Sequence, residues 1–382
     1  MASTQHTPTE LEAAGDLVLP GADELAGRFP LTPNPHPATP EEYGEIMSTL
    51  AFGKKFTDHM AHMRWTREGG WDDRGVIPYG PLELTPGASV FHYCQSVFEG
   101  IKAYKREDGS VWTFRPGYNA ARLNHSARRL ALPELSREDF VASLVDYVRA
   151  DAKWVPEVDG SSLYLRPFMF ASEEFVGVHP AGVVDYYVIG SPSGPYFKGG
   201  LSGVAIWVER EYHRAGPGGT GSAKAGGNYA ASLLPQIQAE AKGFSQVCFL
   251  DTYEGKYLEE LGGMNMFVVM ADGTIRTPEL TGVILEGGTR SAILRLLRDE
   301  GVDVREEKIA LSEVVDGIRS GAVAEVFACG TAAVVTPITR LGGDDFDVEI
   351  EVGDKTRQIH TRLTDIQWGR AEDPYGWTYR LA

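Results

Sequence analysis

Residues 216–229, Gly-Pro-Gly-Gly-Thr-Gly-Ser-Ala-Lys-Ala-Gly-Gly-Asn-Tyr, set one lysine, Lys224, in a loop of six glycines and a proline. An apolar run at 204–208 before the loop predicts a strand, and residues 230–241 after it predict a helix. Glycines let a backbone turn sharply and approach a ligand closely. Lys224 is therefore either a positioned nucleophile or a solvated lysine in a mobile loop, and only the rest of the chain can decide between the two.

The composition is that of an ordinary globular protein of 382 residues, with 43% hydrophobic and 23% charged residues. Its net charge of −17 argues against nucleic-acid or anionic-membrane partners, which require a basic face. Three scattered cysteines form no disulfide framework. No apolar run reaches the ~18 residues needed to span a bilayer. The first basic residue is Arg28, so the expected signal-peptide start is missing and a cytoplasmic protein is expected.

The chain is expected to fold into two domains. Residues 1–40 are rich in Pro, Thr and Ala and predict a poorly ordered segment. A small α/β domain is expected over 41–190, an interdomain linker over 191–200 and a large C-terminal domain over 201–382. Because small-molecule sites favour domain interfaces, a cleft between the two is the expected location of a site.

Predicted elements alternate in an α+β or mixed α/β pattern. Strands are predicted at 89–93, 111–114, 163–170 and 183–189, and helices at 119–130 and 136–153. Further on, strands near 204–208, 246–250, 264–270 and 324–328 alternate with helices near 230–241, 289–300 and 312–319.

Three familiar motifs fit the sequence poorly. Gly216, Gly218 and Gly221 form a Gly-x-Gly-x-x-Gly pattern, but it neither leaves a strand directly nor opens into an apolar helix, as a dinucleotide site requires. Lys224 lacks the flanking residues of a Walker loop. His59 and His62 have the spacing of metal ligands on a helix, but no third ligand is evident, and no metal is expected.

Two turns suit a phosphate better. Glu286-Gly287-Gly288-Thr289-Arg290 leads directly into an apolar helix, whose free N–H groups and dipole favour an anion. Cys329-Gly330-Thr331-Ala332 follows a predicted strand and offers a hydroxyl and closely spaced amides. Either turn alone is also compatible with ordinary helix or strand capping.

A carboxylate pair, Glu259-Glu260, stands before the apolar strand 264–270. A buried carboxylate needs a cationic partner. A nucleophilic amine, two phosphate-grade turns and such a carboxylate together match the needs of pyridoxal phosphate, whose aldehyde, phosphate and pyridinium nitrogen require these three groups. An ion pair at the ring nitrogen is worth about 4 kcal/mol at an effective dielectric near 20.

The sequence resembles the branched-chain aminotransferases of the fold-type IV pyridoxal-phosphate enzymes, from about residue 50 onward. The matching stretches are Phe52-Gly53-Lys54-Lys55-Phe56-Thr57-Asp58-His59-Met60, His92-Tyr93, Phe98-Glu99-Gly100-Ile101-Lys102-Ala103, Phe114-Arg115-Pro116, Ser162-Leu163-Tyr164-Leu165-Arg166-Pro167, Lys224-Ala225-Gly226-Gly227-Asn228-Tyr229, Gly282-Val283-Ile284-Leu285 and Gly330-Thr331-Ala332. The resemblance implies the two-domain, D-amino-acid-aminotransferase-like architecture of that class, with the cofactor at the domain interface.

The resemblance also implies a role for each matching residue. Lys224 would form the internal aldimine with pyridoxal 5′-phosphate and carry the proton between Cα and C4′. Glu260 would pair with the ring nitrogen, Tyr229 with the phenolic oxygen. The phosphate would be held by Arg122, Gly288, Thr289 and Thr331, with Arg214 nearby. The substrate pocket would be lined by Phe52, Tyr164, Arg166, Thr331, Ala332 and the partner subunit's Tyr93 and Val178.

The expected activity is transamination of leucine, isoleucine and valine with 2-oxoglutarate in a homodimer, by ping-pong kinetics. Other fold-type IV enzymes remain alternatives: a D-amino-acid or amine transaminase, or an aminodeoxychorismate lyase. A non-catalytic ligand-binding protein on the same scaffold is a further alternative.

The sequence departs from the pattern of the family at two places. Ala333 and Thr336 occupy the positions of the redox-active cysteine pair of animal members, and Gly263 stands where relatives often have Thr.

Overall fold

The computed structural model describes residues 8–195 and 201–382, which divide into two compact units. We call residues 8–195, 223–226 and 365–382 the N-terminal unit, and residues 201–222 and 227–364 the C-terminal unit. Each unit is built on a β-sheet with helices, which confirms the predicted mixed α/β class.

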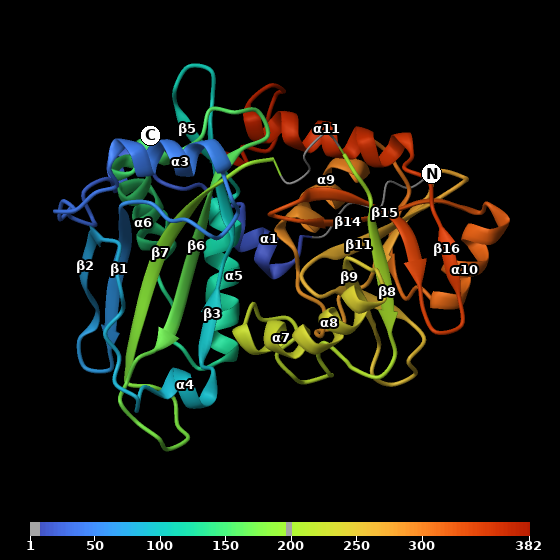
Figure 1. Cartoon of the computed structure of the whole chain (residues 1–382), viewed down its shortest axis with the longest axis horizontal. Helices are drawn as coiled ribbons and strands as arrows, with labels where there is room; N and C mark the ends of the chain where they lie inside the picture. The colour runs from blue at the N-terminus through green and yellow to red at the C-terminus, as the bar shows by residue number, and fades with distance from the viewer. Residues whose placement is uncertain (1–7, 196–200) are drawn as a thin grey trace. The chain divides into compact units, whose positions relative to one another are not determined.

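The N-terminal unit has one sheet in the order β17-β5-β4-β6-β7-β1-β2, with β3 paired to β6. Helices α5 and α6 lie along the sheet (Figure 1). Phe140, Tyr147 and Trp154 are buried in the core of the unit. Its elements are α1 (Glu10–Gly15), α2 (Ala22–Leu25), α3 (Pro40–Thr49), β1 (His59–Thr66), β2 (Gly70–Pro78), α4 (Ser89–Tyr93), β3 (Ser96–Phe98), β4 (Ile101–Lys105), β5 (Val111–Phe114), α5 (Pro116–Arg129), α6 (Arg137–Ala150), β6 (Ser162–Ala171), β7 (Val183–Ser193) and β17 (Thr378–Arg380).

The C-terminal unit has a sheet in the order β10-β9-β8-β15-β14-β11-β12-β13, with β16 paired to β15. Helix α8 packs beside β8 and β9 (Figure 1), and α9 and α10 pack on β14. Its elements are β8 (Val204–Glu209), α7 (Gly226–Ala231), α8 (Leu233–Ala241), β9 (Gln246–Leu250), β10 (Leu258–Leu261), β11 (Asn265–Met270), β12 (Ile275–Pro278), α9 (Gly288–Asp299), β13 (Val304–Glu307), α10 (Leu311–Ser320), β14 (Val323–Gly330), β15 (Val334–Gly342), β16 (Asp347–Glu349) and α11 (Asp354–Trp368).

Most predicted elements are confirmed, because their apolar residues recur at the period of the element they form. The strands at 111–114, 163–170, 183–189, 204–208, 246–250, 264–270 and 324–328 are β5, β6, β7, β8, β9, β11 and β14. The helices at 119–130, 136–153, 289–300 and 312–319 are α5, α6, α9 and α10, and the helix at 230–241 is divided between α7 and α8.

The predicted strand at 89–93 is wrong, because Ser89–Tyr93 is the helix α4. A turn closed by the Ala88 N–H on the Thr85 carbonyl starts the helix, and Cys94 ends it in a left-handed conformation. The run Ser89–Tyr93 is too short to show a periodicity that separates strand from helix, and here the flanking turns decide.

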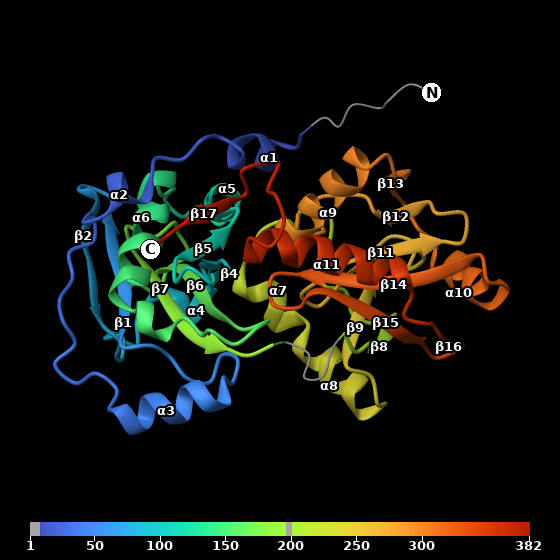
Figure 2. The ribbon, with the colours of Figure 1, turned by 90° about the horizontal axis from the view of Figure 1, so that it is seen from above.

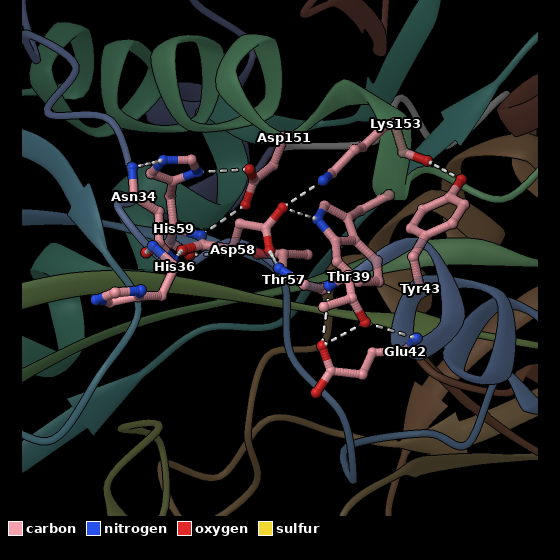
Figure 3. Close-up of polar contacts among 12 residues, drawn as sticks. Asn34, His36, Thr39, Glu42, Tyr43, Thr57, Asp58, His59, Asp151 and Lys153 are labelled. Atoms are coloured by element: carbon pink, nitrogen blue, oxygen red, sulfur yellow. Dashed lines mark hydrogen bonds and ion pairs between the residues drawn. The ribbon is translucent and has the colours of Figure 1, made fainter.

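The segment predicted to be poorly ordered, residues 1–40, is ordered from residue 8 onward, and residues 1–7 lie outside the described part of the chain. Leu25 and Phe29 are buried in the core of the N-terminal unit. Figure 3 shows how a proline-rich stretch is fixed: the Asn34 main-chain N–H donates to His59 Nε2 at 3.0 Å, and the Asn34 side chain donates to the Asp58 carbonyl at 2.7 Å. Prolines thus set an extended path along the unit rather than disorder.

The predicted linker and C-terminal domain also differ from the structure. Ser191-Pro192-Ser193 belongs to β7, and residues 196–200 of the predicted linker are not described. Proline is tolerated there because pairing with β1 covers only Val183–Val188. The division between the units falls within α11, so that residues 365–382, including the end of this helix, belong to the N-terminal unit, where β17 pairs with β5 (Figure 2).

His59 and His62 lie on strand β1, not on a helix, so three residues of separation point them to opposite faces. His59 Nδ1 lies 2.7 Å from Asp151 (Figure 3), and His62 Nε2 lies 2.8 Å from Asp185. Within the described residues, no three His, Cys, Asp or Glu side chains gather as metal ligands would. Nor does any described helix combine the length and the apolar character that crossing a membrane requires.

Candidate active site

The main chain of Lys224 is fixed on both sides within the N-terminal unit. Its N–H donates to Ser126 Oγ, on α5, at 2.8 Å, and its carbonyl accepts from the Phe98 N–H at 3.0 Å. The next residue, Ala225, forms a β-bridge with Val97. Lys224 is therefore not a lysine on a mobile loop. Its backbone lies beside β3 and pairs with it.

Phe98 contacts two of the predicted site residues of this unit. Lys224 Nζ and the Arg166 guanidinium each lie 4.7 Å from the centroid of its ring. Arg166 Nη2 donates to the Tyr164 hydroxyl at 3.1 Å, because residues two apart on β6 share a face. The Phe52 ring lies 4.9 Å from that of Tyr164, edge to face. The reactive amine, a cation and an aromatic wall thus meet in one unit.

Arg122, predicted to hold phosphate, is bound by Glu99 in this unit. Its Nε and Nη2 each donate to a Glu99 carboxylate oxygen at 2.8 Å, and Asn119 donates to the same carboxylate. Glu99 is completely buried and Arg122 is 3% exposed. Sequence patterns assigned no individual roles to Glu99 and Phe98, although both stand in a matching stretch. Their shared signal was an aromatic-acid-glycine run beside a strand.

Tyr93 and Val178, predicted to reach a neighbouring subunit, are exposed in the chain: Val178 is 86% exposed and Tyr93 41%. The Tyr93 hydroxyl donates to the Val176 carbonyl, which ties α4 to the segment that carries Val178. Phe91 on α4 and Val176 on that segment are also exposed. We call these four residues the α4 patch.

In the C-terminal unit, Arg214 joins two other predicted residues. Its Nη1 lies 2.8 Å from Glu260 Oε1, and its guanidinium lies 6.0 Å from the centroid of the Tyr229 ring. The other contacts of Nη1 are the Gly221 and Val283 carbonyls, at 3.2 and 3.1 Å. A Cβ at Gly221 would lie 2.1 Å from the Val283 carbonyl, so only glycine fits this close approach.

Glu260 is the carboxylate that faces this group. It also accepts the Leu285 N–H at 2.7 Å, and it is 2% exposed. Glu259 precedes it on β10, so its side chain points to the other face of the strand. Strand alternation therefore supports the choice of Glu260 over Glu259 that came from the motif spacing.

The two turns that are predicted to bind phosphate lie in the same unit. Gly288 and Thr289 form the first turn of α9, whose N-cap, Gly287, has no side chain to cap the helix. A Cβ at Gly287 would collide with Asn265 Oδ1 at 2.1 Å.

The second turn, Thr331–Ala333, joins β14 to β15 and is followed by Val334 with φ +59°. A β-branched residue in that region is strained, and such strain concentrates at functional turns.

The residues fit the cofactor that the sequence predicts. Arg214 Nε and Nη2 are buried donors that have no hydrogen-bond partner in the described part of the chain. Unpaired buried donors are costly, so they indicate an absent acceptor. A cofactor that brings anionic oxygen atoms would satisfy them.

The cysteines offer no competing chemistry at this site. Cys329 lies at the end of β14, next to the Gly330-Thr331 turn, and burial raises the pKa of its thiol to about 12. The thiol is therefore protonated at neutral pH. Thr336, which stands at one of the animal cysteine positions, is fully buried on β15.

The chain is similar to proteins of one known family along most of its length. Residues 96–341 match the family model described as amino-transferase class IV. A probable branched-chain-amino-acid aminotransferase of Streptomyces coelicolor is 48% identical over 92% of this chain and 98% of its own length.

Solved structures match as well. The branched-chain amino acid aminotransferase of Escherichia coli superposes with a TM-score of 0.70 at 29% identity, over 84% of this chain and all of that one. A branched-chain amino acid aminotransferase of T.th., solved with N-(5′-phosphopyridoxyl)-L-glutamate, gives a TM-score of 0.69 at 26% identity, over 84% of this chain and 99% of that one.

Proposed function

Because the chain belongs to the branched-chain-amino-acid aminotransferases of the class IV family, we propose that it moves the amino group of leucine, isoleucine or valine to 2-oxoglutarate by a ping-pong route. Its cofactor is pyridoxal 5′-phosphate, which when bound supplies an electron sink for the carbanion at the substrate Cα. The observation that carries the proposal is the fixed backbone of Lys224 beside Phe98.

Lys224 Nζ would bind the cofactor and would accept and return a proton at the substrate Cα. Glu260 would hold a proton at the ring nitrogen, and its buried pairing with Arg214 holds its carboxylate in place. Tyr229 would donate a hydrogen bond to the phenolic oxygen. We assign the phosphate to Gly288, Thr289, Thr331 and Arg122, and we assign the unpaired donors of Arg214 to the cofactor's oxygens.

The substrate groups must accept both apolar and acidic side chains. Phe52 and Tyr164 supply an apolar wall, where each buried CH₂ contributes about 0.8 kcal/mol. Arg166, whose buried Nε has no partner among the described residues, is the donor for a carboxylate. The Thr331 and Ala332 amides receive the common α-carboxylate. The T.th. relative was solved with a glutamate adduct, which supports an acidic substrate in this class of site.

We also propose that the chain acts as a homodimer. The α4 patch exposes two aromatic side chains on α4 and two aliphatic side chains on the segment that Tyr93 contacts, and exposed apolar groups of this kind are typical of an interaction surface. In that dimer, the partner subunit's Tyr93 and the partner subunit's Val178 would complete the substrate pocket.

The test is Lys224→Ala, compared with Lys355→Ala, a partly buried lysine at the start of α11. We expect Lys224→Ala to lower leucine-dependent glutamate formation at least about a thousandfold while the fold persists, because no other amine lies at that position. Lys355→Ala should keep wild-type activity. Borohydride reduction and peptide mapping should label Lys224. A label on another lysine, or full activity of Lys224→Ala, would disprove the assignment.

An amino-donor panel separates the alternatives. L-Leucine, D-leucine and a simple amine are each offered with 2-oxoglutarate, and glutamate is measured. Turnover of L-leucine alone supports the proposed function. Preference for D-leucine or the amine would assign the chain to another activity of the class.

A further inference from the structure

A pocket of about 310 Å³ lies in the C-terminal unit, on the face of β10 that carries Glu259. Leu258, Val283 and Ile284 supply apolar walls, and Tyr257 supplies an aromatic one. This volume is at the lower end of the range for small-molecule sites, so it suits a ligand of about one ring. Of the two adjacent carboxylates, Glu259 lines the pocket, whereas Glu260 is bound to Arg214.

Glu259 lines this pocket with an unpaired carboxylate. Its side chain is 8% exposed, and within the described residues it makes neither a hydrogen bond nor a salt bridge. A buried carboxylate without a partner is costly. Burial, followed by the charges of Glu260 and Asp251, raises its pKa to about 7, although the positive charge of Arg214 acts in the opposite direction. A cation in the pocket would relieve that cost.

The other charges around the pocket favour a cationic ligand. Five acidic residues line it, namely Asp251, Glu254, Glu259, Glu279 and Glu307, against one basic residue, Lys308. Asp251 is already bound by three main-chain N–H groups of its own turn, and Glu307 is paired with Arg276. Lys308 Nζ lies 5.1 Å from the Tyr257 ring centroid rather than on Glu259.

We propose that this pocket binds a small organic cation, an amidinium or guanidinium on an apolar ring or short chain, with its charged group on Glu259. A bare metal ion fits less well, because no three acidic, His or Cys side chains of the described residues come together there. The planar amidinium matches a carboxylate with two parallel hydrogen bonds, while the apolar walls take the ring. The proposal does not depend on the substrates of the aminotransferase.

Benzamidinium and benzamide are the probes, because they share a shape and differ in charge. Neither is a primary amine that the cofactor can turn over. We expect benzamidinium to bind the holoenzyme in calorimetry at least tenfold more tightly than benzamide, because only the amidinium can form charge-assisted hydrogen bonds with Glu259. Equal affinities would overturn the proposal.

Two variants place the cation at Glu259. Glu259→Gln keeps the shape and removes the charge, so it should lower benzamidinium affinity at least tenfold and leave benzamide unchanged. Glu351→Gln, which removes one exposed charge elsewhere in the unit, is the matched control and should change nothing. Thr281→Arg adds a tethered guanidinium at the exposed rim of the pocket and should also weaken binding. Unchanged affinity in both Glu259→Gln and Thr281→Arg means that the ion binds elsewhere.

Proton release gives a readout that a structural role of Glu259 would not produce. At pH 6 most of this carboxylate is protonated, so binding a cation should release nearly one proton. At pH 8.5 it is already ionised and almost no proton should leave. Calorimetry in buffers of different ionisation enthalpy measures the number. Release that is the same at both pH values, or is retained in Glu259→Gln, would contradict the assignment.

Discussion

The two units hold their buried arginines in different ways. In the N-terminal unit, Arg122 is bound in a two-point pair by Glu99, and that carboxylate receives a further bond from Asn119. In the C-terminal unit, Arg214 binds Glu260 and two main-chain carbonyls through a single nitrogen, Nη1. Its Nε and Nη2 have no partner in the described residues. We call the first pair closed, because two nitrogens of Arg122 are bound to Glu99 within the unit. The second is open, and it leaves donors for a ligand.

Breaking the closed pair should produce the largest effect, and on stability. Glu99→Gln leaves the Arg122 charge buried and uncompensated, which we expect to lower the unfolding free energy of the N-terminal unit by about 3–5 kcal/mol. Hydrogen exchange of the α5 amides during a urea titration measures it. The control is the apolar double replacement, Glu99→Leu with Arg122→Met, which should be closer to wild type in stability. A mild effect of Glu99→Gln would contradict the closed pair.

Breaking the open pair should instead show in catalysis. Glu260→Gln cannot keep the proton on the ring nitrogen, so kcat should fall at least about a hundredfold with a smaller change in KM. Glu259→Gln points to the other face of β10 and should be mild. Steady-state kinetics of the two variants decides. If Glu259→Gln were the damaging change, the orientation of β10 would be wrong.

Acid should lower the stability of the N-terminal unit by a smaller amount, because it protonates the buried carboxylate of Asp185. Burial alone would raise the pKa of Asp185, but hydrogen bonds from His62 and Arg64 and the charge of Arg64 outweigh it and lower the pKa to about 2. A lowered folded-state pKa gives stability above the ordinary value near 3.8, which is lost as pH falls toward 2. The loss should amount to about 2 kcal/mol, measured by urea titrations between pH 5 and pH 2.5. Asp185→Asn should flatten this part of the pH profile, and an unchanged profile would refute it.

Replacing Arg166 should have the smallest effect of the four. This arginine lies in the N-terminal unit but, like Arg214, has a buried nitrogen, Nε, without a partner among the described residues. Arg166→Ala should lower kcat/KM for glutamate about tenfold relative to leucine, because only the acidic side chain needs the charge. Stopped-flow measurement of both half-reactions gives the ratio. Equal losses would assign Arg166 to the common α-carboxylate or to the fold.

Sequence patterns predicted roles for residues in short local runs, and they did not predict the pairings between distant elements. Lys224 and Glu260 stand in short runs whose spacing carries their chemistry, and strand alternation agrees with the choice of Glu260. The partner of Arg122 could not be predicted, because Glu99 lies on a different element and no local pattern links them. The Phe98 ring between Lys224 and Arg166 was missed for the same reason.

The fold, too, could be predicted from the sequence only where the pattern is local. Strands and helices with a clear apolar period were predicted within a few residues, since burial of one face dictates that period. The five residues of α4 were too few to show one. The order of residues 8–40 depends on single side chains such as Asp58, which accepts the Ala38 N–H at 2.7 Å. Such contacts join distant parts of the chain and leave no mark on composition.

The pairing of β17 with β5 has a consequence for synthesis on the ribosome. Thr378–Arg380 are translated after the whole of the C-terminal unit, yet they complete the sheet edge begun at Val111–Phe114. Until then β5 is an uncovered edge with a row of unpaired amides and carbonyls, which is a template for wrong pairing. A contact so distant in sequence also closes slowly. The nascent chain is therefore most exposed to aggregation late in translation, and chaperone protection should matter most at that stage.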